Sequence, residues 1–110
     1  MRIYKMFRRG QDPVVHVIDT NGPTEPLRHE VYHSPDGFEW GYGGSGPADL
    51  ARSIVADLAR HDATLGEDPS SLSPNYQRVK FALVAALPYQ GGEITEAQVR
   101  EVLSREWLGR

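Results

Sequence analysis

Residues 37–60 read GFEWGYGGSGPADLARSIVADLAR, and the pattern of apolar residues changes within this stretch. In its first part, apolar and polar side chains alternate, which predicts a β-strand at 38–42. Beyond the glycines the apolar residues recur at helical spacing, namely at Leu50, Ala51, Ile54, Val55 and Leu58. This spacing predicts an amphipathic helix at 47–60. The stretch therefore marks the point where a β-rich part of the chain gives way to a helical part.

The residues before this stretch predict three more β-strands. They are expected at 2–7, 13–18 and 27–33, where β-branched and aromatic residues are frequent. Asn21-Gly22 tolerates the positive φ angles of a tight hairpin turn, and Ser34-Pro35-Asp36-Gly37 is typical of a turn between strands. Because a parallel crossover needs about a dozen residues or more, these short connections predict an antiparallel β-meander.

Two more helices are expected in the C-terminal part. The apolar pattern at 75–87 predicts one of them, which Pro88 would end because proline lacks an N–H donor. The other is expected at 95–108, where Thr95 can cap the helix and Gln98 completes a capping box. Strands first and helices afterwards favour a layered α+β fold.

The composition fits a single compact domain spanning residues 1–110. Of these residues 39% are hydrophobic and 25% charged, as in ordinary globular proteins. We therefore predict an α+β fold in which an N-terminal antiparallel β-meander of about four strands, within 1–42, packs against three C-terminal helices. The absence of cysteine excludes disulfides and cysteine nucleophiles. No apolar run approaches the roughly 18 residues of a membrane span, so a cytoplasmic protein without a membrane partner is expected.

Charge is distributed unevenly along the chain. The first nine residues carry a charge of +4, so the other 101 carry −7. A mainly acidic body argues against extensive nucleic-acid binding, which needs a coherent basic surface. The basic start is interpreted first as an edge strand that its charge protects from aggregation. The alternative is a weak nucleic-acid contact through Arg2, Lys5, Arg8 and Arg9.

The glycine-rich segment before the first helix allows three interpretations. One is structural, because glycine lets the chain turn sharply between sheet and helix. Another is a small ligand, such as a nucleotide or metabolite, held by Gly43–Gly46 and the following helix N-terminus. If Gly46 is the N-cap, however, Asp49 falls at the third helical position, where its carboxylate competes with a bound anion. The third interpretation is a partner-binding surface.

Aromatic residues precede these glycines. On a strand, Phe38, Trp40 and Tyr42 would share one face, with Glu39 on the other. Covered by helices, the aromatic face is core, whereas at the rim of the sheet it would anchor a ligand or a protein partner. Glu39 would be the polar group of such a site. The candidate binding residues are therefore Glu39, Trp40, Tyr42, Gly43, Gly44, Ser45 and Gly46.

No pattern typical of catalysis or of a metal centre is present in the sequence. His16, His29 and His33 fall on neighbouring predicted strands, but their spacing matches no established zinc motif. Ser45 lies in Gly-Gly-Ser-Gly rather than in the Gly-x-Ser-x-Gly elbow of hydrolases. We therefore assign no catalytic residue, no metal ligand and no cofactor, and we expect a protein that is not an enzyme.

The run HSPDGFEWGYGGSGPADLA at 33–51 resembles the hallmark of a small bacterial and phage-associated family of uncharacterised domains. The likeness is dense over 33–58 and looser beyond, where Tyr76, Lys80 and the helix containing Trp107-Leu108 occupy the expected places. The resemblance brings no reaction, cofactor or catalytic residue. It implies a single small domain, often encoded among mobile elements, where adaptors and inhibitors are expected.

These observations favour a small non-catalytic protein-interaction module, an adaptor or an inhibitor. Its contact surface would be the aromatic strand and the glycine-rich loop at 38–47. The expected partner is a protein, and a second copy of this chain is one candidate. Small-ligand binding at Gly43–Gly46 and weak nucleic-acid binding through the basic first strand stay open as alternatives.

Overall fold

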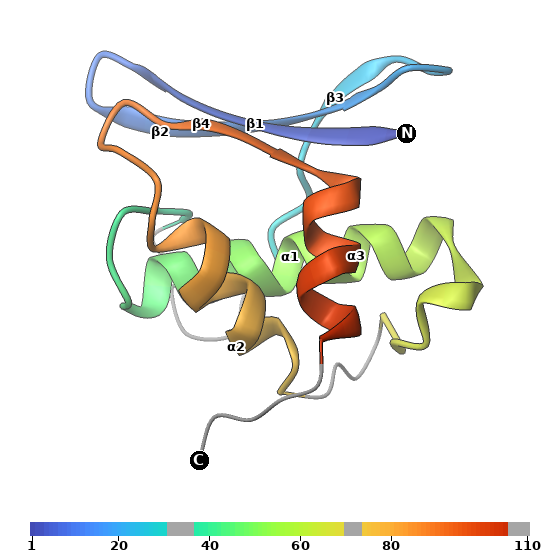
Figure 1. Ribbon diagram of the computed structural model, residues 1–110. Helices are drawn as coiled ribbons and strands as arrows, with labels where there is room; N and C mark the ends of the chain where they lie inside the picture. The colour runs from blue at the N-terminus through green and yellow to red at the C-terminus, as the bar shows by residue number, and fades with distance from the viewer. Residues whose placement is uncertain (31–36, 70–73, 106–110) are drawn as a thin grey trace.

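The computed structural model describes residues 1–30, 37–69 and 74–105. A four-stranded antiparallel sheet forms one layer, and the helices pack against one of its faces as the second layer (Figure 1). The structure thus confirms the predicted α+β class. None of the helices in the described part of the chain is long and apolar enough to cross a membrane.

The sheet is assembled from both ends of the chain. β1 (Arg2–Arg9), β2 (Asp12–Asp19) and β3 (Thr24–Pro26) form an antiparallel meander, as predicted. β4 (Gly92–Thr95) comes from the C-terminal part and pairs with β1, so the order is β3-β2-β1-β4. β1 therefore has a partner on each side, and its interpretation as an edge strand is wrong.

The helical layer is dominated by α1 (Ser45–His61), which runs beneath the sheet (Figure 1). The short 3-10 helix η1 (Ala63–Leu65) follows it. α2 (Tyr76–Val79) continues directly into a π-helical turn, η2 (Lys80–Val84). α3 (Glu96–Ser104) begins where β4 ends.

The core lies between these two layers. Strand alternation turns Tyr4 and Met6 of β1 toward the helices, and both are at most 2% exposed. Leu50, Ile54 and Leu58 recur on one face of α1 and are at most 1% exposed. Burying apolar area of this kind, worth roughly 25 cal/mol per Å², is the main force that holds the helices on the sheet.

Residues 38–42 do not form the predicted strand. Gly37 and Gly41 have φ angles of 115° and 88°, in the left-handed region that an extended strand cannot include. The Gly41 N–H donates to the Val84 carbonyl oxygen at 3.1 Å, so the main chain of this segment is bonded to the end of a helix and does not pair with a strand. The fourth strand is β4 instead.

The prediction of a strand at 27–33 is also wrong for residues 27–30, the part of it that the structure describes. β3 ends at Pro26, and residues 27–30 belong to no strand, while 31–33 lie outside the described residues. The Leu27 N–H still donates to the Val15 carbonyl oxygen of β2 at 3.0 Å, and the Leu27 side chain is buried in the core. The Glu30 N–H then donates to the Ser53 hydroxyl of α1 at 2.8 Å, which ties this segment to the helical layer.

The helix predicted at 75–87 ends earlier, at Val84. In a continuing α-helix the Val84 carbonyl would accept from the residue four positions later, but Pro88 has no N–H to give. That carbonyl accepts instead from the Leu87 N–H at 3.3 Å and from the Gly41 N–H at 3.1 Å. The proline thus ends the helix one turn before its own position, and the Val84 carbonyl also holds the loop that leads into α1 through its bond to Gly41.

The two main helices begin differently. α1 starts at Ser45 with Gly44 as its N-cap, so the expected cap at Gly46 is wrong. Asp49 is consequently no capping residue, and its fully buried carboxylate lies 2.9 Å from Nε2 of His29. The capping box of α3 is confirmed, because the Gln98 N–H donates to the Thr95 hydroxyl while the Thr95 N–H donates to the Gln98 side chain.

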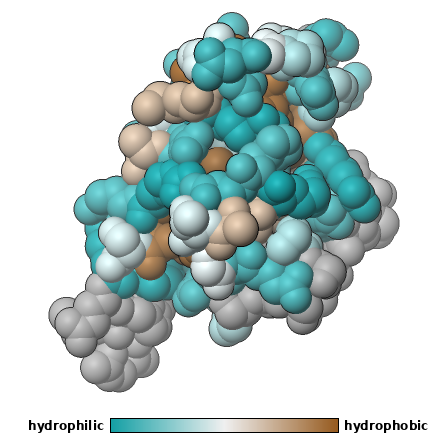
Figure 2. Space-filling view, turned by 90° about the vertical axis from the view of Figure 1, so that its right-hand side faces the viewer, coloured by the Kyte–Doolittle hydropathy of each residue, from teal (hydrophilic) through white to brown (hydrophobic). Residues whose placement is uncertain are grey.

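The two ends of α1 face different surroundings. Its C-terminal end and the tip of the β2–β3 hairpin lie at one end of the molecule, whose surface is mainly hydrophilic (Figures 1 and 2). The N-terminal end of α1 lies at the opposite end, beside the glycine-rich loop and α2 (Figure 1). The candidate site is at this second end.

Candidate functional site

Three exposed aromatic side chains lie around the loop that precedes α1. Tyr42, Phe81 and Tyr89 are 53%, 61% and 59% exposed. The ring of Tyr42 lies against Gly44, and the ring of Phe81 lies beside Gly43, where an added Cβ atom would be 3.6 Å from it. Clustered exposed apolar side chains mark interaction sites more often than scattered ones do. These three residues are referred to below as the aromatic surface.

A groove of about 380 Å³ joins two members of the aromatic surface. Tyr42 and Tyr89 line it, together with Leu87. Tyr89 is the second residue of a β-turn in which the Gly91 N–H donates to the Pro88 carbonyl oxygen at 2.9 Å. The turn therefore places the Tyr89 side chain on the outside of the molecule.

Arg8 of β1 lies in the wall of this groove and fixes its shape. Its guanidinium lies 3.9 Å from the ring centre of Tyr89 and 4.5 Å from that of Trp40. Two of its nitrogens donate to the Glu39 carboxylate at 2.9 and 3.2 Å, and Nε donates to the Tyr89 carbonyl at 2.7 Å. Hydrogen bonding to Glu39 raises the pKa of Arg8 above its ordinary value. The Arg8 side chain is only 7% exposed, so this cation belongs to the buried framework that holds the groove in shape and does not face solvent.

Trp40 belongs to the core and not to the exposed surface. It is 3% exposed, and its Nε1–H donates to the Tyr89 carbonyl at 3.0 Å. Phe38 is partly buried against the core, whereas Tyr42 is exposed. The expectation that these three aromatic residues share one face is therefore wrong. Trp40 also lines the groove from below, and its bond to the Tyr89 carbonyl helps to hold the Tyr89 turn in place.

The glycines of the loop allow close packing. Gly44 has the Tyr42 ring against it, and Gly46 is buried under Glu39, whose amide nitrogen would be 3.2 Å from an added Cβ atom. Lys80 donates to the Gly43 carbonyl at 3.4 Å and so ties the loop to η2. Ser45 is exposed. The structure thus brings Glu39 together with the candidate residues 42–46. Phe81 and Tyr89 also lie at this site, although they were not among the candidates from the sequence.

The sequence matches a family of unknown function, DUF6166, over residues 4–105. The chain belongs to this family. The match includes Arg8, Glu39 and every residue of the aromatic surface, but the family carries no assigned activity. No curated protein and no solved structure matches the chain. The bacterial and phage association implied by the resemblance stays a prediction.

The basic residues of β1 in this DUF6166 protein do not form one surface. Arg2 and Arg8 are 11% and 7% exposed and are held by carboxylates. Lys5 and Arg9 are exposed and, by strand alternation, lie on the face of the sheet turned away from the helices. The four cations are thus divided between two sides of the strand. Nucleic-acid binding stays a prediction that this arrangement does not support.

The histidines also lie apart. The ring of His16 packs edge-on against Phe7 at 5.1 Å between ring centres, and His29 is paired with Asp49. His33 lies outside the described residues. Among the residues that the structure does describe, no three potential metal ligands are grouped.

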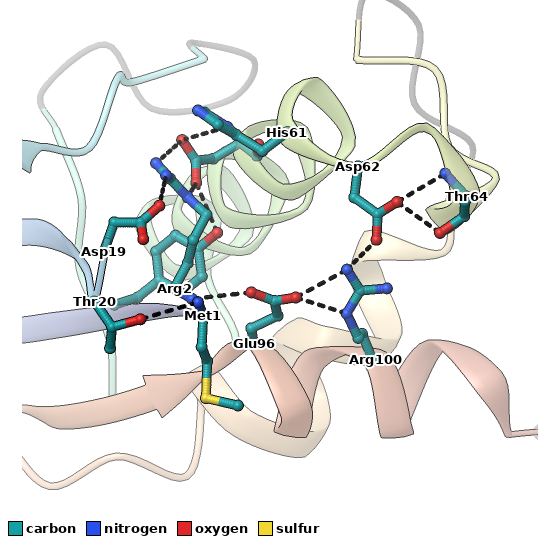
Figure 3. A network of polar contacts seen from close by, with 11 residues as sticks. Met1, Arg2, Asp19, Thr20, His61, Asp62, Thr64, Glu96 and Arg100 are labelled. Carbon is teal, nitrogen blue, oxygen red and sulfur yellow. Dashed lines mark hydrogen bonds and ion pairs between the residues drawn. The ribbon is translucent and has the colours of Figure 1, made fainter. Parts of the chain in front are cut away.

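A polar network that was not predicted from the sequence lies at the C-terminal end of α1, opposite the candidate site (Figure 3). Its centre is Asp57 of α1, which accepts from the Arg2 guanidinium at 2.7 and 3.0 Å. The Tyr4 hydroxyl also donates to this carboxylate, at 2.7 Å. Burial, together with the adjacent Asp57 carboxylate, raises the pKa of Tyr4 above its ordinary value. Arg2 additionally donates to Asp19 of β2 at 3.0 Å.

The same network connects α3 to the end of α1 (Figure 3). Glu96 accepts from the Arg2 N–H at 2.9 Å and from Arg100 at 2.9 Å. Arg100 also donates to Asp62, which follows α1. Each charged side chain of this network, from Arg2 to Asp62, lies beside a side chain of opposite charge. The network therefore holds the sheet and two helices together, and we assign it a structural role.

Acid should weaken this network at Asp62. The Thr64 hydroxyl donates to its carboxylate at 2.6 Å, and this bond, together with Arg100, lowers the pKa of Asp62 from 3.8 to about 2. A folded-state pKa below the unfolded value stabilises the protein above pH 3.8, and this contribution is lost as the pH falls toward 2. In a carboxyl-carbon NMR titration we expect Thr64→Val to raise the pKa of Asp62. An unchanged midpoint in the variant would contradict this assignment.

Proposed function

We propose that this protein is a small non-catalytic interaction module that binds a protein partner through the aromatic surface. The proposal rests on one observation, namely that Tyr42, Phe81 and Tyr89 are exposed together at one end of α1. The resemblance to phage-associated domains supports an adaptor or inhibitor as the kind of module.

The residue types of this surface suit a protein interface. Aromatic side chains bury a large area with few rotatable bonds, and tyrosine adds a hydroxyl that can bond to a partner. Burying one such ring at the centre of an interface is worth about 2 kcal/mol or more when it fills a pocket on the partner. The expected partner therefore presents an apolar surface with hydrogen-bond acceptors near its rim.

The framework beneath the surface favours binding without rearrangement. Arg8 is stacked between Trp40 and Tyr89 and bonded to Glu39, so four residues from three segments restrain one another. Restraint before binding lowers the entropy that association costs. The groove between Tyr42 and Tyr89 should consequently have the same shape in the free and the bound protein.

Site-specific photo-crosslinking in the native cells tests this proposal. We expect p-benzoylphenylalanine at position 42, 81 or 89 to give one defined crosslinked protein. The matched control is the same residue at Ala63, which is exposed at the hydrophilic end of the molecule. A product at 63 of equal yield, or none at the three aromatic positions, would contradict the proposal. A crosslink to a second copy of this chain would identify the partner as itself.

Substitution of an exposed ring should separate binding from folding. Phe81→Ser removes a side chain that is 61% exposed, so the free energy of unfolding should change by less than about 0.5 kcal/mol. We nevertheless expect it to remove most of the crosslinked product obtained from position 42. Thr24→Ala, an exposed position at the hydrophilic end, is the control and should leave the yield unchanged. Equal yields in both variants would remove Phe81 from the contact surface.

A further inference from the structure

The sheet has an outer face, and none of the helices in the described part of the chain covers it (Figure 1). Strand alternation assigns its side chains, because Tyr4 of β1 and Val17 of β2 are buried toward the helices. Their neighbours along each strand therefore point outward. At the centre of the outer face these residues are Ile3, Lys5 and Phe7 of β1 and Val14, His16 and Ile18 of β2. The six residues are referred to below as the outer patch.

The outer patch is mainly apolar, which is unusual for a sheet face in water. An antiparallel sheet with one solvated face normally alternates between apolar residues inside and polar residues outside. In the outer patch the only polar members are Lys5 and His16. Two apolar cross-strand pairs lie on either side of them, Ile3 with Ile18 and Phe7 with Val14. These four side chains are half-buried by their neighbours, so part of each is left for a partner to cover.

Charged residues of both signs border the outer patch. Arg9 and Asp12 are exposed opposite each other at the end of β1 and β2. The Arg9 guanidinium lies 5.8 Å from the ring centre of Phe7, on the same face. Glu93 of β4 is exposed opposite Lys5. Two cations are thus balanced by two carboxylates, which disfavours a polyanion such as nucleic acid and favours a partner of mixed charge.

A second copy of this chain complements the outer face when a two-fold axis runs parallel to the strands, between β1 and β2. Because the strand order is β3-β2-β1-β4, this axis divides the sheet equally and places β1 over β2 of the other copy. Each residue then faces the copy of its own cross-strand partner, so Ile3 meets Ile18 of the second copy. In the same way Arg9 meets Asp12, so opposite charges face each other at one end of the interface. Self-complementarity of this kind is what a two-fold interface requires.

We propose that two copies of this chain associate through their outer faces into a weak symmetric dimer. β1 and β2 have eight residues each, about 27 Å of strand, and four strands span about 19 Å. The face is thus at most about 500 Å² in projection, and two copies together bury about 1,000 Å², the lower end for a specific interface. The central Lys5 also limits the affinity, because its ammonium must reach toward Glu93 at the rim to stay hydrated. The dimer should therefore dissociate at micromolar concentrations.

This inference does not depend on the proposed function. The aromatic surface lies beside the N-terminal end of α1 and contains no residue of the outer patch. The two surfaces can therefore be tested separately, by one substitution in each.

Sedimentation equilibrium of the full chain, from low micromolar to millimolar concentration, tests the dimer. We expect the average mass to rise reversibly from that of a monomer to that of a dimer. Phe7→Lys should keep the chain monomeric, whereas Tyr42→Lys on the aromatic surface is the matched control and should leave the association unchanged. A monomer at every concentration would overturn the inference. A dimer that Tyr42→Lys abolishes and Phe7→Lys does not would also overturn it, and would make the second copy the partner of the aromatic surface.

Charge reversal tests the two-fold arrangement without touching an apolar residue. Arg9→Asp or Asp12→Arg alone places like charges opposite each other in the dimer and should weaken association by about tenfold. Both residues are exposed, so each variant should fold. A mixture of the two variants restores opposite charges at both contacts and should associate more tightly than either variant alone. A mixture no tighter than its components would contradict the proposed interface.

Discussion

Replacing Gly91 with alanine is expected to destabilise the protein by about 3 kcal/mol or more. Gly91 has a φ angle of 104°, which already disfavours any side chain. An added Cβ atom would also run into the carbonyl group of Met6, with the carbonyl carbon at 2.7 Å and the Phe7 nitrogen at 3.2 Å. These are main-chain atoms of β1, which is paired on both sides, so they cannot move without breaking the sheet.

Gly10→Ala is the matched control for this substitution. Gly10 also has a positive φ angle, 63°, but no atom lies within 4 Å of an added Cβ atom. Only the conformational cost of the left-handed region applies there, about 1 kcal/mol. Equilibrium unfolding in urea should therefore separate the two variants clearly. Similar losses of unfolding free energy would show that the close approach of Gly91 to β1 is not what matters.

The close approach at Gly91 also bears on the candidate site. Gly91 ends the turn that carries Tyr89 and leads directly into β4. Pairing of β4 with β1 places that turn beside Arg8, whose guanidinium then contacts both the ring and the carbonyl of Tyr89. One glycine thus links the fourth strand of the sheet to the position of an exposed aromatic residue.

Local patterns predicted the elements whose stability is decided locally. The alternation in β1 and β2, the helical spacing in α1 and the capping box at Thr95 all lie within a few residues of one another in the sequence. β4 escaped prediction because it has only four residues and is defined by pairing with β1, about 90 positions earlier. A prediction from local sequence patterns compares residues that are close together in the chain, so it cannot detect this pairing.

The aromatic segment at 38–42 shows how such a pattern can mislead. Alternating aromatic and polar residues are typical of a strand, yet the Gly41 N–H donates to the Val84 carbonyl oxygen, which Pro88 cannot bond because it has no N–H. Tyr42 is exposed because the chain turns at Gly41, and not because it lies on the outer face of a strand. Phe81 lies within the predicted helix at 75–87, where one more apolar residue gives no sign of exposure. For Tyr89 there was a signal, because the turn-forming Pro88 and Gly91 on either side of it are typical of an exposed position.

The second large effect is expected for Asp57→Ala, which should cost about 3–5 kcal/mol of unfolding free energy. Asp57 is 5% exposed and accepts hydrogen bonds from Arg2 and Tyr4. Its removal leaves the Arg2 guanidinium, whose side chain is 11% exposed, without its main partner. Asp19 keeps a single contact to this cation and does not replace the two bonds that are lost.

Tyr4→Phe separates the buried charge from the hydrogen bond in the same place. It keeps the Asp57–Arg2 pair and the packed ring and removes only the hydroxyl that donates to Asp57. A loss of about 1 kcal/mol is expected, the usual worth of one hydrogen bond. Urea unfolding of both variants at neutral pH is the measurement. If Asp57→Ala were no worse than Tyr4→Phe, Arg2 would have to reach solvent or Asp19 at little cost, and the network would not hold β1 to α1.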